Sequence, residues 1–489
     1  MCDPDRPDVS RLNPPSRVAL KARLARTGRH PGGIAVYGAA TGVAAVLTLV
    51  QTRVLWGGLT PADFGMWALV DPILTPLAAL VLFGIDHAMV KMLHMDRMPL
   101  PVVAGLLLVS TLPATTLCLA AIGLIAEAIF HSAWTNALLL AVAGEALILM
   151  TLTGLRASSA SGPFGAVLVS RNLLYLVVLL ILREQGPISV NMAFLTRGAC
   201  VFAVSLAALA ILRPQPRFDR AVYLDAVRYG FPLLLTTFIY ALMDMTDRWF
   251  VAGFSGVVAV GTYTLHLKTA AIMAQAIVVP FGLWFPTERF KRLNDIDQGR
   301  LFFRRSAAAL SVICAYVSGI VWLGRDILLP LIAPGVVASP LVLGCCLGSV
   351  TCLALSHAVN VGMLMPGHTG KNVTCTAMAA AAAVAAAAIL TPPFGPDGAA
   401  ISRLLAGLVL VGVTALSSHR VFRITFPFVG MLMYFAASTI TAVAIDGASN
   451  TPGLLSATVE LVVWTAVTGF LGGFLWNSVR APTCNEAVS

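Results

Sequence analysis

Apolar segments long enough to cross a membrane alternate with short polar segments along most of this 489-residue chain. A helix needs about 20 apolar residues to span a bilayer, and fourteen segments reach that length. Proline and glycine between them, as at Pro366-Gly367, mark turns. The pattern predicts an all-α polytopic membrane protein with spans at 34–56, 62–85, 99–126, 134–155, 163–182, 189–212, 228–253, 258–286, 303–324, 336–362, 373–391, 396–416, 424–445 and 454–476.

The composition leaves no room for a sizeable soluble domain. Hydrophobic residues make up 58% of the chain and charged residues only 11%, whereas soluble domains have about 25% charged residues. The nine cysteines lie mostly within apolar runs and show neither metal-ligand nor disulfide spacing. They are expected to be small packing residues.

The basic residues predict the orientation. If the N-terminus is inside, 24 of the 32 Lys and Arg residues lie in the inner connections, in the two tails or at the adjoining span ends. The outer connections hold only Arg183 and Arg325. Membrane proteins keep Lys and Arg in their cytoplasmic loops, so both termini are predicted to be cytoplasmic. The net charge of +10 therefore indicates topology and not a nucleic-acid partner.

A weak internal repeat suggests two bundles. Tyr37-Gly38 and Arg53 in the first hairpin match Tyr229-Gly230 and Arg248 about 192–196 residues later. Since each unit would hold six spans, the two would be parallel repeats, a layout typical of transporters. The predicted division is a cytoplasmic basic tail 1–32, a six-helix bundle 33–212, a basic linker 213–227, a six-helix bundle 228–416, a terminal helix pair 417–476 and a cytoplasmic tail 477–489.

A polar stripe runs along the seventh span, which opens the stretch from Arg228 to Arg292. Its members recur every three or four residues, which places them on one face of a helix. A charge at bilayer depth costs about 2.5–3.5 kcal/mol, so such residues normally face protein or a wet cavity. The stripe is therefore predicted to face inward, and it consists of Thr237, Tyr240, Asp244, Asp247 and Arg248.

Two hairpins carry a family resemblance. Residues 59–65 (LTPADFG) followed by Phe83-Gly84-Ile85, and Tyr229-Gly230-Phe231-Pro232 with Asp247-Arg248 and Val260-Gly261-Thr262-Tyr263, resemble bacterial polysaccharide flippases of the Wzx type. These belong to the MOP superfamily, with the lipid II flippases and the MATE exporters. The resemblance implies a MOP/MATE-like fold and transport of an undecaprenyl-pyrophosphate-linked oligosaccharide from the cytoplasmic to the periplasmic leaflet of the inner membrane. The resemblance also implies that the transported oligosaccharide serves surface or exopolysaccharide biosynthesis. A polysaccharide polymerase and glycosyltransferases would then be partners of the protein.

Five of the six cations within spans lie in the outer half of their helices, and Arg171 lies nearer the inside. If they converge, they form a cationic central cavity for alternating access. Such a cavity suits a pyrophosphate or an acidic sugar, because Arg presents a planar fork of donors and Lys a point charge. The alternatives are that Asp244 neutralises Arg248 and that Arg53 snorkels. The predicted substrate-binding residues are Arg53, Arg197, Arg248, Lys268 and Arg403.

Acids within the spans raise the question of ion coupling. A proton- or sodium-coupled transporter needs such groups to titrate or to bind the ion, although pairing with the cations and simple packing of His266 are equally open. The candidates are Asp71, Glu145, Asp244, Asp247 and His266. No metal or other cofactor is expected.

No nucleophile motif, glycine loop or His-Cys cluster is found, so the chain is not expected to be an enzyme. An ion-coupled MATE-like exporter of small molecules is the alternative function. A membrane polysaccharide polymerase or ligase is less favoured, because it would need a large catalytic periplasmic loop that the sequence lacks.

Overall fold

The computed structural model of the chain describes residues 31–94, 98–130, 135–158, 160–215, 218–282, 285, 296–361, 369–421, 424, 426–448 and 454–480. Within these ranges the regular structure is helical and contains no strand. The predicted tail 1–32 lies almost wholly outside the described residues, as do residues 481–489 and the basic segment 288–292.

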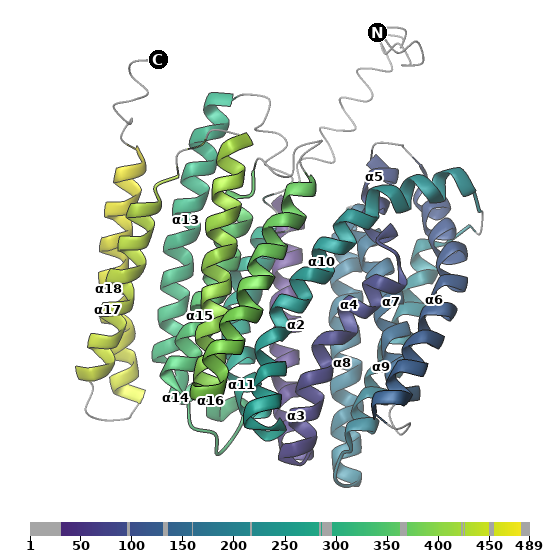
Figure 1. Cartoon of the computed structure of the whole chain (residues 1–489), viewed down its shortest axis with the longest axis horizontal. Helices are drawn as coiled ribbons and strands as arrows, with labels where there is room; N and C mark the ends of the chain where they lie inside the picture. The colour runs from purple at the N-terminus through teal and green to yellow at the C-terminus, as the bar shows by residue number, and fades with distance from the viewer. Residues whose placement is uncertain are drawn as a thin grey trace.

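The helices stand side by side in one broad bundle (Figure 1). We call residues 31–212 the first half and residues 220–421 the second half. The first half contains α2 (Pro31–Gly58), α3 (Pro61–Val70), η2 (Asp71–Ile73), α4 (Leu74–Val81), α5 (Ile85–His94), α6 (Leu100–Phe130), α7 (Thr135–Ala157), α8 (Ser161–Gln185) and α9 (Val190–Leu212). The second half contains α10 (Arg220–Ser255), α11 (Val257–Met273), η3 (Ala274–Val278), α13 (Ile296–Leu323), α14 (Arg325–Ile332), α15 (Pro340–Val359) and α16 (Thr369–Val421).

The protein is a multi-pass membrane protein, and the predicted all-α fold class is confirmed. Eleven helices of the described chain are long and apolar enough to cross a membrane. Gly395, with φ 56° and ψ −133°, divides α16 into two arms that match the predicted spans 373–391 and 396–416. The remaining predicted spans correspond to α6 and α18, so the number fourteen is consistent with the structure. Helix α10 begins eight residues before the predicted span and includes part of the predicted linker.

Local chemistry explains the main helix boundaries. Thr60 caps α3 by accepting a hydrogen bond from the backbone N–H of Asp63, and Pro61 occupies the first helical position. Ser189 caps α9 in the same way. Pro72 has no N–H to donate to the α3 ladder, and the 3₁₀ turn η2 replaces a helical turn there. The regular α-helix is therefore interrupted at Asp71-Pro72.

The two halves meet backbone to backbone through glycines at both ends of the bundle. A Cβ atom on Gly65 would lie 2.0 Å from the carbonyl oxygen of Val257, and one on Gly230 would lie 2.0 Å from that of Gly84. Helix α3 lies at the lower end of Figure 1 and α5 at the upper end. A 2.6 Å ion pair between Lys91 and Asp225 reinforces the upper contact. The glycines of the two family-like hairpins therefore face each other across the junction.

The last two helices, α17 (Phe428–Ala448) and α18 (Leu454–Arg480), lie at the edge of the bundle (Figure 1). The indole of Trp464 is buried and donates a 3.0 Å hydrogen bond to the backbone oxygen of Tyr316 on α13. Arg325 of α14 forms a 2.8 Å ion pair with Asp446 of α17. The terminal pair is therefore anchored to the second half near α13 and α14.

The glycine contacts predict a stability effect. Replacing Gly65 or Gly230 with Ala forces a methyl group into a carbonyl oxygen, and such overpacking costs about 1–3 kcal/mol. Thermal unfolding of the purified protein in detergent should show a lower midpoint for either variant. Gly412→Ala is the matched control, because nothing lies within 4 Å of a Cβ atom there. Equal midpoints for the three variants would contradict the close approach of the halves.

Candidate functional site

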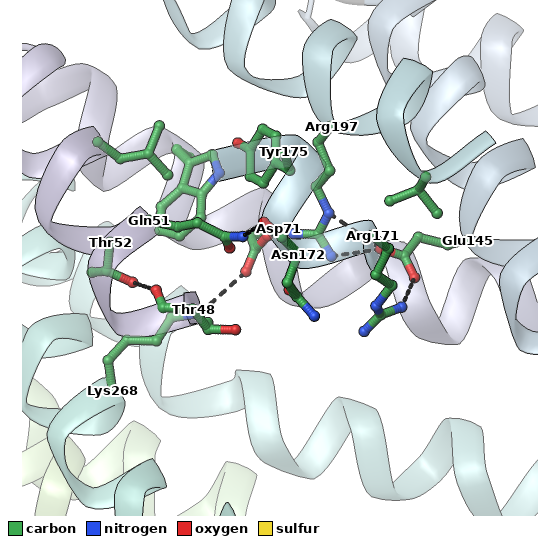
Figure 2. Close-up of a pocket in the computed structure, with 13 residues that line it drawn as sticks. Thr48, Gln51, Thr52, Asp71, Glu145, Arg171, Asn172, Tyr175, Arg197 and Lys268 are labelled. Atoms are coloured by element: carbon green, nitrogen blue, oxygen red, sulfur yellow. Dashed lines mark hydrogen bonds and ion pairs between the residues drawn. The ribbon is translucent and has the colours of Figure 1, made fainter. Parts of the chain in front are cut away.

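A charged cavity of about 150 Å³ lies inside the bundle (Figure 2). Residues of both halves line it, mostly near the middle of their helices. They are Thr48, Gln51, Thr52 and Leu55 of α2, Trp67 of α3, Asp71 of η2, Glu145 of α7, Arg171, Asn172 and Tyr175 of α8, Arg197 and Val201 of α9, and Lys268 of α11. We call this space the central cavity.

Arg197 is the hub of the central cavity. Its Nη2 lies 2.7 Å from Oε1 of Glu145, and its Nη1 pairs with Oδ1 of Asp71. Nη1 of Arg171 lies 3.5 Å from the other oxygen of Glu145. Figure 2 shows Asp71, Arg197, Glu145 and Arg171 side by side in one row of charges. Asp71 and Glu145 therefore neutralise Arg171 and Arg197.

Lys268 connects this row to the second half. Its Nζ lies 3.4 Å from Oδ2 of Asp71 and 5.2 Å from the ring centroid of Trp67. Asp71 thus holds a cation of each half, one on each carboxylate oxygen. Asp71 and Lys268 are 197 residues apart in the sequence, so their ion pair joins distant parts of the chain. The attraction between two such charges is stronger where little water screens them.

Neutral polar groups complete the lining. Gln51 donates a 2.6 Å hydrogen bond to the backbone oxygen of Asn172, and the Tyr175 hydroxyl donates a 3.2 Å bond to that of Ala193. The indole Nε1 of Trp67 is buried and has no hydrogen-bond partner among the described residues. The lining of the cavity therefore contains a hydrogen-bond donor, the Trp67 Nε1–H, that no acceptor of the described chain satisfies.

A second charged cluster lies within the second half and includes the polar stripe of α10. Nη1 of Arg403 lies 2.9 Å from Oδ2 of Asp247, and its Nη2 pairs with Asp244. The hydroxyl of Tyr263 donates a 2.6 Å hydrogen bond to Asp247. Arg248 lies 3.8 Å from Asp244. Tyr240, Asp244 and Arg403 also line a smaller hollow of about 40 Å³, so this part of the stripe faces protein.

The predicted cations are thus divided among three places. Lys268 and Arg197 line the central cavity, and Arg248 and Arg403 belong to the second cluster. Arg53 is exposed and donates a hydrogen bond to the backbone oxygen of Leu331. Arg53 therefore lies apart from both clusters, in keeping with the alternative that it snorkels.

The predicted acids and His266 are all held by protein partners. Asp71, Glu145, Asp244 and Asp247 pair with the cations described above. His266 is buried; its Nδ1 lies 2.9 Å from the Thr262 oxygen, and its Nε2 accepts a 2.9 Å hydrogen bond from the N–H of Ser339. Ser339 is the N-cap of α15, so the neutral imidazole joins α11 to the start of α15.

Several cavity residues were not predicted from the sequence, chiefly Arg171, Asn172, Trp67 and Gln51. Arg171 was not among the predicted substrate-binding residues, because it lies nearer the inner end of its span than the other cations. The depth of a residue in its span does not indicate which residues of other helices lie beside it. A usable signal exists for Trp67, because it precedes Asp71 by four residues and so shares its helix face. Gln51 stands in an apolar run with no such pattern. In the described part of the chain, no group of three or more His, Cys, Asp or Glu side chains is placed to hold a metal ion.

The environment of His266 predicts a structural role. His266→Ala removes the acceptor for the Ser339 N–H, and a buried donor without a partner costs about 1–3 kcal/mol. The thermal midpoint in detergent should fall, while transport per correctly inserted molecule should persist. Loss of transport with an unchanged midpoint would instead identify His266 as a proton relay.

The second cluster predicts a contrast between two arginines. Arg403→Met leaves two carboxylates without their main partner, and breaking such a buried pair costs about 3–5 kcal/mol. Arg53→Met removes one hydrogen bond at an exposed position and should leave the midpoint nearly unchanged. Thermal unfolding of the two variants side by side tests this, and equal effects would contradict the assigned pairing.

The fold matches known transporters of low sequence identity. The lipid II flippase MurJ in an inward closed conformation superposes with a TM-score of 0.58 at 13% identity, covering 91% of this chain and 99% of MurJ. An inward-facing multidrug resistance MATE transporter of the MOP superfamily gives 0.58 at 15%, covering 81% and 96%. A MOP superfamily transporter from Pyrococcus furiosus, described as having a binding pocket of reverse polarity, gives 0.55 at 17%, covering 79% and 95%.

Sequence comparison identifies the family. No curated protein sequence matches the chain significantly. Residues 58–315, more than half of the chain, match the family described as "Polysaccharide biosynthesis protein". Both this family and the structural relatives agree with the expectation that the chain is not an enzyme. The chain belongs to the polysaccharide biosynthesis protein family and has the fold of the MOP superfamily transporters, as its resemblance to Wzx-type flippases implied.

Proposed function

We propose that this protein flips an undecaprenyl-pyrophosphate-linked oligosaccharide from the cytoplasmic to the periplasmic leaflet of the bacterial inner membrane. The movement supplies polysaccharide biosynthesis at the cell surface. The observation that supports the proposal is the central cavity, which is lined by Arg171 and Arg197 of the first half and Lys268 of the second half. Both termini are cytoplasmic in this proposal, as the distribution of basic residues predicts.

The lining suits a phosphorylated sugar. Arg171 and Arg197 present planar forks of N–H donors that match phosphate oxygens, and Lys268 adds a point charge. Asn172, Gln51 and Thr48 offer polar groups for sugar hydroxyls. A hydrogen bond from such donors is electrostatically stronger inside a protein than in bulk water.

The size of the central cavity indicates how transport must proceed. At about 150 Å³ it is smaller than the roughly 300–1,000 Å³ of ordinary ligand pockets. The halves must therefore separate at one end to admit an oligosaccharide. The glycine contacts at Gly65 and Gly84 suit this movement, because flat backbone surfaces part without unlocking interdigitated side chains. Alternate opening of the two ends gives alternating access.

The balance of charge favours an anionic cargo over the small cations that a MATE-like exporter would carry. In the described parts of the two clusters, Arg171, Arg197, Arg248, Lys268 and Arg403 stand against four acids. Each acid already pairs with a cation. A cationic drug would have to displace an arginine or lysine to reach a carboxylate. In this proposal, coupling to H⁺ or Na⁺ through these acids supplies the energy for transport, and the acids do not bind the cargo.

Export of surface polysaccharide tests the function. In a strain that lacks the gene, Lys268→Gln and Arg171→Gln should insert normally but restore about ten- to a hundredfold less export than the unmodified protein. Each charge-assisted hydrogen bond to phosphate is worth about 1.5–3 kcal/mol, and 1.4 kcal/mol is a factor of ten. Lipid-linked oligosaccharide should accumulate in the cells.

Arg53→Gln is the matched control, because Arg53 lies outside both clusters, and it should restore full export. Normal export by both single variants and by the Lys268→Gln/Arg171→Gln double variant would contradict the proposed cargo. A changed susceptibility to cationic drugs, with export intact, would favour the MATE-like alternative.

A further inference from the structure

Asp71 occupies an unusual position among the acids of the bundle. Its two carboxylate oxygens hold cations from different halves, Arg197 through Oδ1 and Lys268 through Oδ2. Arg197 keeps a second acid, Glu145. Lys268 forms no other ion pair with the described residues. A single carboxylate thus occupies the place where donors from both halves converge.

Trp67 supplies an independent sign that this place is made for a ligand. The side chain is only 4% exposed, it lines the central cavity, and its Nε1–H has no acceptor in the described chain. An unpartnered buried donor costs about 1–3 kcal/mol, so a ligand oxygen beside it would be stabilising. Trp67 also lies within 5.2 Å of the Lys268 ammonium.

We propose that Asp71 is an internal competitor of the cargo: its carboxylate occupies, between Arg197 and Lys268, the position that a phosphate group of the lipid-linked cargo takes on binding. This inference rests on the proposed function. A diphosphate carries more negative charge than a carboxylate and offers more acceptor oxygens to an arginine fork. It therefore displaces Asp71, and it also accepts a hydrogen bond from the indole of Trp67.

The displacement has a mechanical consequence. The Lys268–Asp71 pair joins the second half to the first half at the level of the central cavity. When Asp71 leaves Lys268, this link between the halves breaks. Asp71 is the first residue of the 3₁₀ turn η2, and its backbone N–H bonds to the carbonyl oxygen of Trp67. Movement of the turn therefore carries the acid and the indole together, so cargo binding loosens the junction that must open.

Binding of inorganic pyrophosphate to the purified full-length protein in detergent tests the proposal. Isothermal titration at constant ionic strength should show that Asp71→Asn binds about tenfold or more tightly than the unmodified protein, because no carboxylate competes. Asp71→Glu keeps the acid and should bind weakly, like the unmodified protein. Asp63→Asn removes a half-buried acid in the first turn of α3, eight residues before Asp71 and outside the lining of the central cavity, and should change nothing.

Since Asp71→Asn leaves Lys268 without its partner, the comparison is repeated in a Lys268→Gln background. There the added Asp71→Asn should still tighten pyrophosphate binding several-fold, because Asp71 competes at Arg197 as well. Unchanged affinity on removing the carboxylate in both backgrounds overturns the competitor role.

The two levels of the proposal fail in different ways. Binding that disappears in Arg197→Gln but does not respond to Asp71→Asn would leave the cargo site standing and remove the competitor. If neither the unmodified protein nor any variant binds pyrophosphate, and Lys268→Gln exports polysaccharide normally, the proposed function and the competitor fall together.

Discussion

Pairing of charges inside the membrane is the constraint on which the rest of this structure depends. A lone charge at bilayer depth is costly, and this chain carries acids and cations near the middle of several apolar helices. Arg197 satisfies Asp71 and Glu145 in the first half, and Arg403 satisfies Asp244 and Asp247 in the second. Each pair fixes the rotation of the helices that carry it, because only one face of each helix can present its charge to the partner.

Most ion pairs of the two clusters join helices of the same half and do not join the two halves to each other. Between the halves the structure uses glycine backbones at Gly65 and Gly84, the Lys268–Asp71 pair at the central cavity and the Lys91–Asp225 pair. Among the described residues, the arginine–carboxylate pairs of the two clusters lie within a half, and the two ion pairs between the halves are both made by lysines. In the proposed alternating access, that distribution would let each half move as a unit while the junction opens and closes.

The same distribution links stability to function. Acids that neutralise the cavity arginines keep the empty protein stable, yet they occupy donors that an anionic cargo would use. In the proposed function, a cargo phosphate replaces a carboxylate at an arginine, so the buried arginine has an anionic partner both before and after the exchange. The central cavity is therefore stable when empty and remains ready for an anion.

Much of the fold could be predicted from the sequence. Hydropathy is a local property, so the lengths of the apolar runs located most of the spans, and the gap between the predicted spans 373–391 and 396–416 coincides with the kink at Gly395. The charge types were also visible, as was the inward polar stripe of α10. The family resemblance rests on glycines that meet at the junction of the halves, where a side chain would prevent close approach.

Only the tertiary structure decided which charges meet. Depth along a span grouped Arg53 with Arg197 and set Arg171 apart, yet Arg171 lines the central cavity and Arg53 is exposed. Depth fixes the level of a residue in the membrane, whereas its partner depends on the rotation and neighbours of its helix. Those are set by packing between segments as distant in sequence as Asp71 and Lys268. The sequence by itself determined that charged residues lie within the membrane spans and need partners. The packing of the helices determined which residues form the pairs.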